Sequence, residues 1–194
     1  MKKTVIGAIA LLGAMAVTSV SAKETISAVG SSSVTPLMEV FSETYMKTNS
    51  NVFIEVQGPG SSAGVKAAKN GSADLGMSSR NLKDSEKEPA LKELTVALDG
   101  IAVVVNPKND LQALTAEQVT AIYKGDITNW KEVGGADKPI VAITRDTASG
   151  TRGAFEDIMK LKKKISGKKV SAISQRAQVA NGNGALKTLS LIHI

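Results

Sequence analysis

The chain has 194 residues, of which 24 are Lys or Arg and 18 are Asp or Glu, and it contains no cysteine. Without cysteine it can form no disulfide scaffold and no zinc–thiolate site, and it has no cysteine nucleophile. Aromatic residues make up only 3% of the sequence, so the core must be aliphatic, and a hydrophobic fraction of 42% is typical of a folded globular protein.

Residues 1–22 are typical of a secretory signal peptide. Lys2 and Lys3 precede an apolar stretch over 5–17, and Val20-Ser21-Ala22 forms a small-x-small cleavage pattern. The apolar stretch is too short to cross a bilayer, which needs about 20 residues. Lys23 stands where a lipoprotein would need cysteine, so we expect a periplasmic protein that is exported without a lipid anchor.

The next two segments share one pattern, a short strand followed by a Gly/Ser-rich loop and a helix. The first has a strand at 26–29, the loop 30–35 and a helix. Apolar residues recur at helical spacing in this helix: Leu37, Val40, Phe41 and Tyr45. The second has an alternating strand at 52–56, the loop 58–62 and a helix that stops at Asn70-Gly71.

The sequence pattern in the middle of the chain predicts further strands and helices. A short buried strand is expected at 73–77, a charged helix at 83–93 and a continuous apolar strand at 101–105. Residues 106–114 are interpreted as a crossing into a second region. There, Thr115 and Gln118 form a capping box ahead of a short helix.

The second region repeats the strand, loop and helix pattern. A loop at 125–136 contains Trp130, and a strand at 140–143 leads through the loop 145–152 into another helix. The six lysines of 160–169 favour a solvated helix end and loop over a nucleic-acid patch. Strands that alternate with helices predict an α/β fold with parallel sheets, in three layers.

Three hydroxyl-rich loops, 30–35, 60–62 and 149–152, stand where a strand gives way to a helix. The first N–H groups of a helix lack partners within it and carry partial positive charge, so an anion binds there readily. If the carboxyl ends of the strands converge, these loops surround one tetrahedral oxyanion, and Arg145 and Arg152 could add bidentate charge. Each loop taken alone is more often a set of helix caps or a flexible loop, and only the three together favour an anion site.

A hydrolase is the alternative from another class. Gly60-Ser61-Ser62-Ala63-Gly64 fits the Gly-x-Ser-x-Gly elbow, with Ser62 as nucleophile. The only histidine is His193, near the end of the chain, so a Ser-His-Asp triad is disfavoured and a base would have to be Lys66 or Lys69. No pattern for a metal, a nucleotide or another cofactor is present, and we expect no enzyme activity.

Six ordered motifs between Ile26 and Lys187 resemble the periplasmic phosphate-binding proteins of high-affinity phosphate ABC importers. They are GSSSVTP at 30–36, QGPGSSAGV at 57–65, DLGMSSR at 74–80, ALDGIAVVVN at 97–106, IYKGDITNW at 122–130 and TRDTASGTRGAFE at 144–156. The resemblance implies a two-lobed type II periplasmic-binding-protein fold whose lobes are three-layer α/β sandwiches.

In function, the resemblance implies a monomer that captures inorganic phosphate between its lobes and delivers it to a membrane permease, with no nucleic acid involved. The phosphate-binding residues carried over by motif are Ser32, Ser33, Thr35, Ser61, Arg145, Ser149, Gly150 and Thr151. Some members have an aspartate after the third motif, where this chain has Ser79 and Arg80.

Asp99 is therefore the preferred candidate for the carboxylate that accepts the phosphate proton, and Asp74 and Asp146 are the alternative candidates. Phosphate keeps at least one O–H at neutral pH and sulfate keeps none, so a buried carboxylate favours phosphate. If none of these carboxylates points into the cleft, a sulfate- or molybdate-binding protein becomes the better interpretation.

The end of the chain departs from the resembled family. Residues 189–194 match the translation of an inverted transposon-end adapter used in sequencing libraries, although a native apolar strand remains the alternative. We therefore expect a first lobe at 23–105 that lacks its C-terminal return segment and an incomplete second lobe at 106–188. The tail 189–194 is expected to be foreign.

Overall fold

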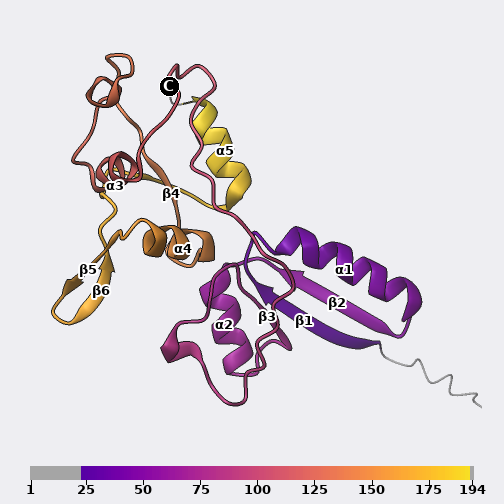
Figure 1. Ribbon diagram of the computed structural model, residues 1–194. Coiled ribbons are helices and arrows are strands. Elements are labelled where there is room, and N and C mark those ends of the chain that lie inside the picture. The colour runs from indigo at the N-terminus through magenta and orange to yellow at the C-terminus, as the bar shows by residue number, and fades with distance from the viewer. Residues whose placement is uncertain (1–22, 193–194) are drawn as a thin grey trace, which may run out of the picture.

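The computed structural model describes residues 23–192, so the predicted signal peptide and His193 lie outside the described residues. These residues form two bodies, which lie one above the other in Figure 1. The first body holds two helices and three strands: β1 (Glu24–Gly30), α1 (Thr35–Thr48), β2 (Val52–Gln57), α2 (Ser61–Lys69) and β3 (Leu75–Met77).

The strands of the first body form a parallel sheet in the order β2-β1-β3. Ile26 pairs with Ile54 in β2, and Ala28 pairs with Leu75 in β3. Because all three strands run in the same direction, their carboxyl ends meet at one edge of the sheet. The loops after β1, β2 and β3 therefore leave the sheet side by side, as the parallel arrangement predicts.

Helix α1 packs on the sheet by a face that its apolar pattern does not predict. The predicted row of Leu37, Val40, Phe41 and Tyr45 is 38–59% exposed. Ser42 is buried instead, and Met46 lies against β2, where its sulfur accepts from the Ile54 N–H at 3.4 Å. Thr35 and Pro36 have the pattern of a cap and a first helical residue, but the helix starts one residue earlier, at Thr35, with Val34 at the cap.

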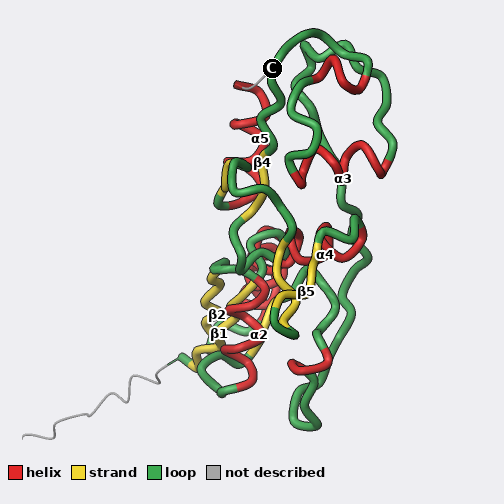
Figure 2. The backbone as a smooth tube through the Cα atoms, turned by 90° about the vertical axis from the view of Figure 1, so that its left-hand side faces the viewer, coloured by secondary structure: helices red, strands yellow, loops and turns green. Residues whose placement is uncertain are grey.

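The segment between the two bodies corrects two predictions. The helix predicted at 83–93 is a single 3₁₀ turn, η1 (Asp84–Glu86). The strand predicted at 101–105 has no regular structure, and its residues are exposed. A strand needs a partner for its backbone hydrogen bonds, and no described residue pairs with this segment. Figure 2 draws most of this region as loop.

The second body contains helices, short strands and a hairpin. Its elements are α3 (Ala116–Lys124), η2 (Trp130–Val133), β4 (Ile143–Arg145), α4 (Gly150–Ile158), β5 (Lys162–Ile165), β6 (Lys168–Ser171), β7 (Gln178–Ala180) and α5 (Gly182–Ile192). The capping box of α3 is confirmed, because the Thr115 hydroxyl accepts from the Gln118 N–H at 3.2 Å and the Gln118 side chain accepts from the Thr115 N–H at 2.8 Å. β4 and β7 pair in parallel.

The lysine-rich segment is a β-hairpin rather than a helix end. β5 and β6 pair antiparallel, and both turn residues, Ser166 and Gly167, have positive φ. Such a turn matches the twist of the two strands, so the hairpin closes without extra residues.

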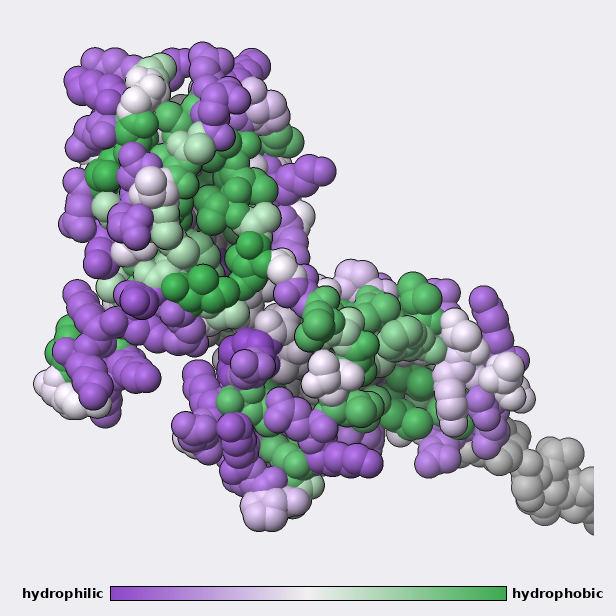
Figure 3. Space-filling model, in the orientation of Figure 1, coloured by the Kyte–Doolittle hydropathy of each residue, from purple (hydrophilic) through white to green (hydrophobic). Residues whose placement is uncertain are grey.

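Apolar side chains gather over the second body in Figure 3. They line a hollow between residues 101–105, α3 and residues 140–143. Residues 189–192 continue α5, and the Asn106 side chain donates to the Leu191 carbonyl at 2.7 Å. The foreign origin of 189–194 and the lobe boundaries stay predictions. Within residues 23–192, no helix is both long and apolar enough to cross a membrane.

Candidate anion-binding site

The loop between β1 and α1 is built around Ser31. Ser31 is only 2% exposed, and its N–H donates to the carbonyl of Met77 at 2.9 Å, which ties the loop to the end of β3. The Ser31 carbonyl accepts from both the N–H and the hydroxyl of Thr35 at 3.0 Å. The Thr35 hydroxyl therefore stabilises the first turn of α1 in this structure, while Ser32 and Ser33 make contacts outside the loop.

The loop before α2 brings the first body against the second. Gly60 has φ +113°, its N–H donates to the Gly30 carbonyl at 2.7 Å, and a Cβ there would lie 2.8 Å from the Ala148 carbonyl. Only glycine combines this backbone conformation with so close an approach. The Ser62 N–H then donates to the same Ala148 carbonyl at 3.2 Å. The start of α2 and the loop before α4 are thus in direct contact.

Ser61 occupies the first position of α2 and is completely buried. Its hydroxyl lies 3.3 Å from the Ser79 hydroxyl and accepts from the Ser79 N–H at 3.1 Å. A Cβ added to Gly150, the first residue of α4, would collide with the Ser61 hydroxyl and lie 2.6 Å from that of Ser79. The helix α4 can begin against this pair only because residue 150 is a glycine.

Ser149 caps α4. Its hydroxyl accepts from the Arg152 N–H at 3.2 Å, and its side chain is buried. Two residues further, the Thr151 hydroxyl lies 3.1 Å from that of Ser33, across 118 positions of sequence. Hydroxyl groups both donate and accept, so this pair can reorient toward an anion without a change in the backbone.

Arg145, at the end of β4, connects the two bodies. One terminal nitrogen, Nη2, donates to the Ser32 hydroxyl at 2.8 Å, and Nη1 donates to Asn183 Oδ1 at 2.6 Å. The side chain amide of Asn183 also donates to the Ser33 hydroxyl at 3.4 Å. One guanidinium group therefore joins the loop before α1 to the start of α5.

The charge of Arg145 is less compensated than that of its neighbours. Arg80 pairs with Glu86 at 2.7 Å and Arg152 with Glu156 at 2.9 Å, whereas the nearest carboxylate to Arg145 is that of Asp146 at 3.9 Å. Arg145 is only 4% exposed, and its Nε has no hydrogen-bond partner within residues 23–192. Burying a charge without a close counter-ion is costly, so a bound anion would stabilise this group.

The structure brings together eight of the nine predicted site residues. They are Ser32, Ser33, Thr35, Ser61, Arg145, Ser149, Gly150 and Thr151. The ninth, Asp99, is an exposed residue of the loop that follows η1, and its carboxylate accepts from the N–H of the next residue, Gly100, at 2.7 Å. Asp99 is not gathered with the others.

The two alternative candidates for the carboxylate, Asp74 and Asp146, lie at different distances from the cluster. The carboxylate of Asp74 accepts from the N–H and the hydroxyl of Ser27, both at 2.8 Å, and these bonds hold its pKa below the usual value. They tie Asp74 to β1. Asp146 follows Arg145 directly and accepts from the Ala148 N–H at 2.8 Å. Of the three aspartates, Asp146 is the one that lies beside the cluster.

Sequence reasoning missed two residues of the cluster, Asn183 and Ser79. A signal for Asn183 was present, because Asn181-Gly182-Asn183-Gly184 follows the strand β7 and opens the helix α5, as the Gly/Ser-rich loops do in the other units. β7 has only three residues, too few for a clear alternation. Ser79 was noted only for the aspartate that it replaces.

Ser62, the nucleophile of the hydrolase alternative, has no general base within hydrogen-bond distance among the described residues. The Ser62 hydroxyl accepts from Arg80 Nη2 at 3.4 Å, and Lys69 pairs with Glu88 at 2.7 Å. In the part of the chain that the structure describes, neither Lys66 nor Lys69 has a hydrogen bond to Ser62. The described residues also contain no group of three or more acidic or histidine side chains that could hold a metal ion.

Two α/β bodies that meet at a cluster of hydroxyl groups and arginine side chains are the arrangement expected of a two-lobed type II periplasmic-binding-protein fold. The chain belongs to the PBP superfamily domain family, whose family model matches residues 16–193. The fold class expected from the sequence is therefore confirmed.

Named relatives and solved structures agree with this family. The chain is 47% identical over 104 residues to phosphate-binding protein PstS 2 of Streptococcus agalactiae, and 33% identical over 130 residues to phosphate-binding protein PstS of Borreliella burgdorferi. These matches cover 54% and 67% of this chain but only 36% and 47% of the relatives, so the matched regions span less than half of their length.

Two crystal structures match over a longer region. One, from Clostridium perfringens, is of a protein named for substrate binding in phosphate ABC transport and contains bound phosphate. It is 42% identical with a TM-score of 0.77, and the match covers 86% of this chain and 66% of that one. The other is an ABC-type phosphate transport receptor from Vibrio cholerae, 44% identical with a TM-score of 0.67, covering 86% and 67%.

Proposed function

We propose that this protein captures inorganic phosphate between its two bodies and delivers it to the membrane permease of an ABC importer. The observation that carries the proposal is the buried guanidinium of Arg145. It is held by Ser32 and Asn183, and its charge lacks a close carboxylate. Relatives with phosphate-binding names and a phosphate-containing neighbour support phosphate as the anion.

The predicted site supplies more donors than a single ion pair would. Helices α1, α2 and α4 begin next to one another, so several N–H groups and the hydroxyls of Ser33, Ser61 and Thr151 can surround one tetrahedral anion. Of the predicted ligands, the Thr35 and Ser149 hydroxyls already accept or donate within their own loops. We therefore expect these two to contribute less than Arg145.

Sulfate binding is the second candidate, because Asp99 does not lie with the cluster. Hydroxyl groups can donate to either anion, so they discriminate weakly between phosphate and sulfate. Selectivity then depends on whether Asp146 accepts the phosphate proton. In this proposal the protein acts outside the cytoplasm as a monomer, after removal of residues 1–22 and without a lipid anchor.

Titration calorimetry tests the proposal. Phosphate should bind with one site per chain and compete with sulfate, and the protein should release no phosphate from an aryl phosphate ester. Hydrolysis that disappears in Ser62→Ala would favour the enzyme instead. A protein that binds sulfate and ignores phosphate would favour the second candidate.

A further inference from the structure

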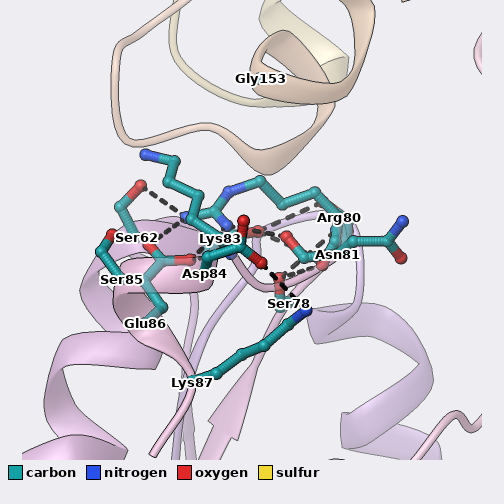
Figure 4. Close-up of polar contacts among 12 residues, drawn as sticks. Ser62, Ser78, Arg80, Asn81, Lys83, Asp84, Ser85, Glu86, Lys87 and Gly153 are labelled. Atoms are coloured by element: carbon teal, nitrogen blue, oxygen red, sulfur yellow. Dashed lines mark hydrogen bonds and ion pairs between the residues drawn. The ribbon is translucent and has the colours of Figure 1, made fainter. Parts of the chain in front are cut away.

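We propose that the Arg80–Glu86 ion pair is a positioning device that holds the Ser61 and Ser79 hydroxyls in place at the anion site. This inference rests on the proposed function and concerns the same cluster. Figure 4 shows the pair with the residues around it. Nothing in the predicted ligand set includes Arg80, Glu86 or Ser79.

The two side chains form a bidentate ion pair. Arg80 Nη1 donates to Glu86 Oε2 at 2.7 Å, and Nη2 donates to Oε1 at 2.8 Å. The Arg80 side chain is 6% exposed and that of Glu86 16%. The Lys83 N–H also donates to Glu86 Oε2 at 2.8 Å, which ties the carboxylate to the start of η1. Bidentate geometry fixes the direction of both groups as well as their distance.

The pair is attached to the loop that carries Ser79. Ser79 directly precedes Arg80, and the Ser78 hydroxyl closes a turn around it. That hydroxyl donates to the Arg80 carbonyl at 2.8 Å and accepts from the Arg80 N–H at 3.3 Å. The Arg80 side chain is therefore attached to the turn that contains Ser79. From this turn, the Ser79 N–H donates to the Ser61 hydroxyl at 3.1 Å.

Arg80 also touches both helices that begin at the cluster. Its Nη2 donates to the Ser62 hydroxyl in the first turn of α2 at 3.4 Å. On its other side, a Cβ added to Gly153 of α4 would lie 3.3 Å from Arg80 Cδ. The stem of Arg80 thus forms part of the surface on which α4 rests, next to the place where Gly150 meets Ser61 and Ser79.

Charge distinguishes this arginine from a ligand. Hydrogen bonding to Arg80 lowers the pKa of Glu86 to about 2, so the carboxylate is ionised and compensates the guanidinium at neutral pH. Arg145, by contrast, has its nearest carboxylate, that of Asp146, at 3.9 Å, without a hydrogen bond. The structure therefore assigns the binding charge to Arg145 and a positioning role to Arg80. A buried ion pair is weak evidence for stability in itself, which makes a role in geometry the better account.

A double-mutant cycle tests this role. Arg80→Gln, Glu86→Gln and Ser79→Ala are each made alone, and each of the first two is combined with Ser79→Ala. Phosphate affinity is measured by calorimetry. Each single change should weaken binding by about threefold to tenfold, because it removes or misplaces a hydrogen-bonding hydroxyl. Once Ser79 is alanine, loss of the ion pair should cause little further weakening.

Glu88→Gln is the matched control, because it breaks the nearby ion pair with Lys69, which touches neither Ser61 nor Ser79 in the described contacts. Its affinity should equal that of the wild type. Glu86→Gln has the volume of the original side chain, so it remains informative if Arg80→Gln fails to fold.

Losses that add up in the double variants would show that Arg80 acts on the anion by another route. Unchanged affinity in Glu86→Gln would show that the pair is only structural. Either result overturns the inference while the proposed function stands. A wild-type protein that binds no phosphate overturns both.

Discussion

Arg145 and Ser32 are 113 positions apart in sequence, and their side chains lie 2.8 Å apart. Arg145 ends a strand of the second body, and Ser32 follows a strand of the first. A hydrogen bond from a buried guanidinium to a neutral hydroxyl does not balance the positive charge as a bond to a carboxylate would, and the nearest carboxylate, that of Asp146, is 3.9 Å away. The two bodies therefore meet at a point that favours the arrival of an anion.

Arg145→Ala should weaken phosphate binding at least about tenfold, because each charge-assisted hydrogen bond contributes roughly 1.5–3 kcal/mol. Calorimetric titration measures the change. Arg176→Ala is the control, since Arg176 is exposed apart from its bond to the Gly125 carbonyl at 3.2 Å. Near-normal affinity in Arg145→Ala would remove this residue from the site.

Gly150→Ala should reduce phosphate affinity by about 10- to 100-fold. The new methyl group would collide with the Ser61 hydroxyl, and overpacking of this kind costs about 1–3 kcal/mol. Gly184→Ala provides the comparison, because its added Cβ would meet nothing within 4 Å. Equal affinities for the two variants would contradict the contact between α4 and α2.

Asp146→Asn should reduce the preference for phosphate over sulfate, measured in competition binding. The amide has the same shape but presents a donor where a carboxylate could accept the phosphate proton. Asp99→Asn should leave the preference unchanged, because the Asp99 carboxylate contacts only the neighbouring Gly100 N–H in the described structure. If Asp99→Asn alone changes the preference, the expectation from the sequence was right and Asp146 is not the sensor.

Acid should destabilise the protein partly through Glu86. The pKa of Glu86 is lowered from its usual 4.5 to about 2 when the chain is folded, chiefly by its bonds to Arg80. A lowered carboxyl pKa contributes stability that is complete above pH 4.5 and is lost as the pH falls toward 2. Urea unfolding of Glu86→Gln across this range should therefore show a weaker pH dependence than the wild type. Parallel curves would contradict the ion pair.

Local signals predicted the parts of this fold that depend on neighbouring residues. The loops around Ser61 and Ser149 were recognisable because glycine and hydroxyl residues follow apolar strands and precede helices. The capping box at Thr115 is of the same kind. These features need only a few consecutive residues, so the sequence shows them directly.

Features that depend on distant partners were harder to predict. An apolar run such as 101–105 becomes a strand only if another strand pairs with it, and its composition does not reveal whether one does. The buried face of α1 centres on Ser42 although a more apolar row was available. Asn183 reaches Arg145 only through the pairing of β7 with β4, two short strands with weak patterns.

A crystal structure of the protein with phosphate tests the central claim most directly. We predict one tetrahedral anion between the loop that contains Ser32 and Ser33 and the start of α4, with its oxygens within hydrogen-bond distance of the Arg145 guanidinium. An anion bound away from Arg145, or no anion there at saturating phosphate, would contradict the proposed function.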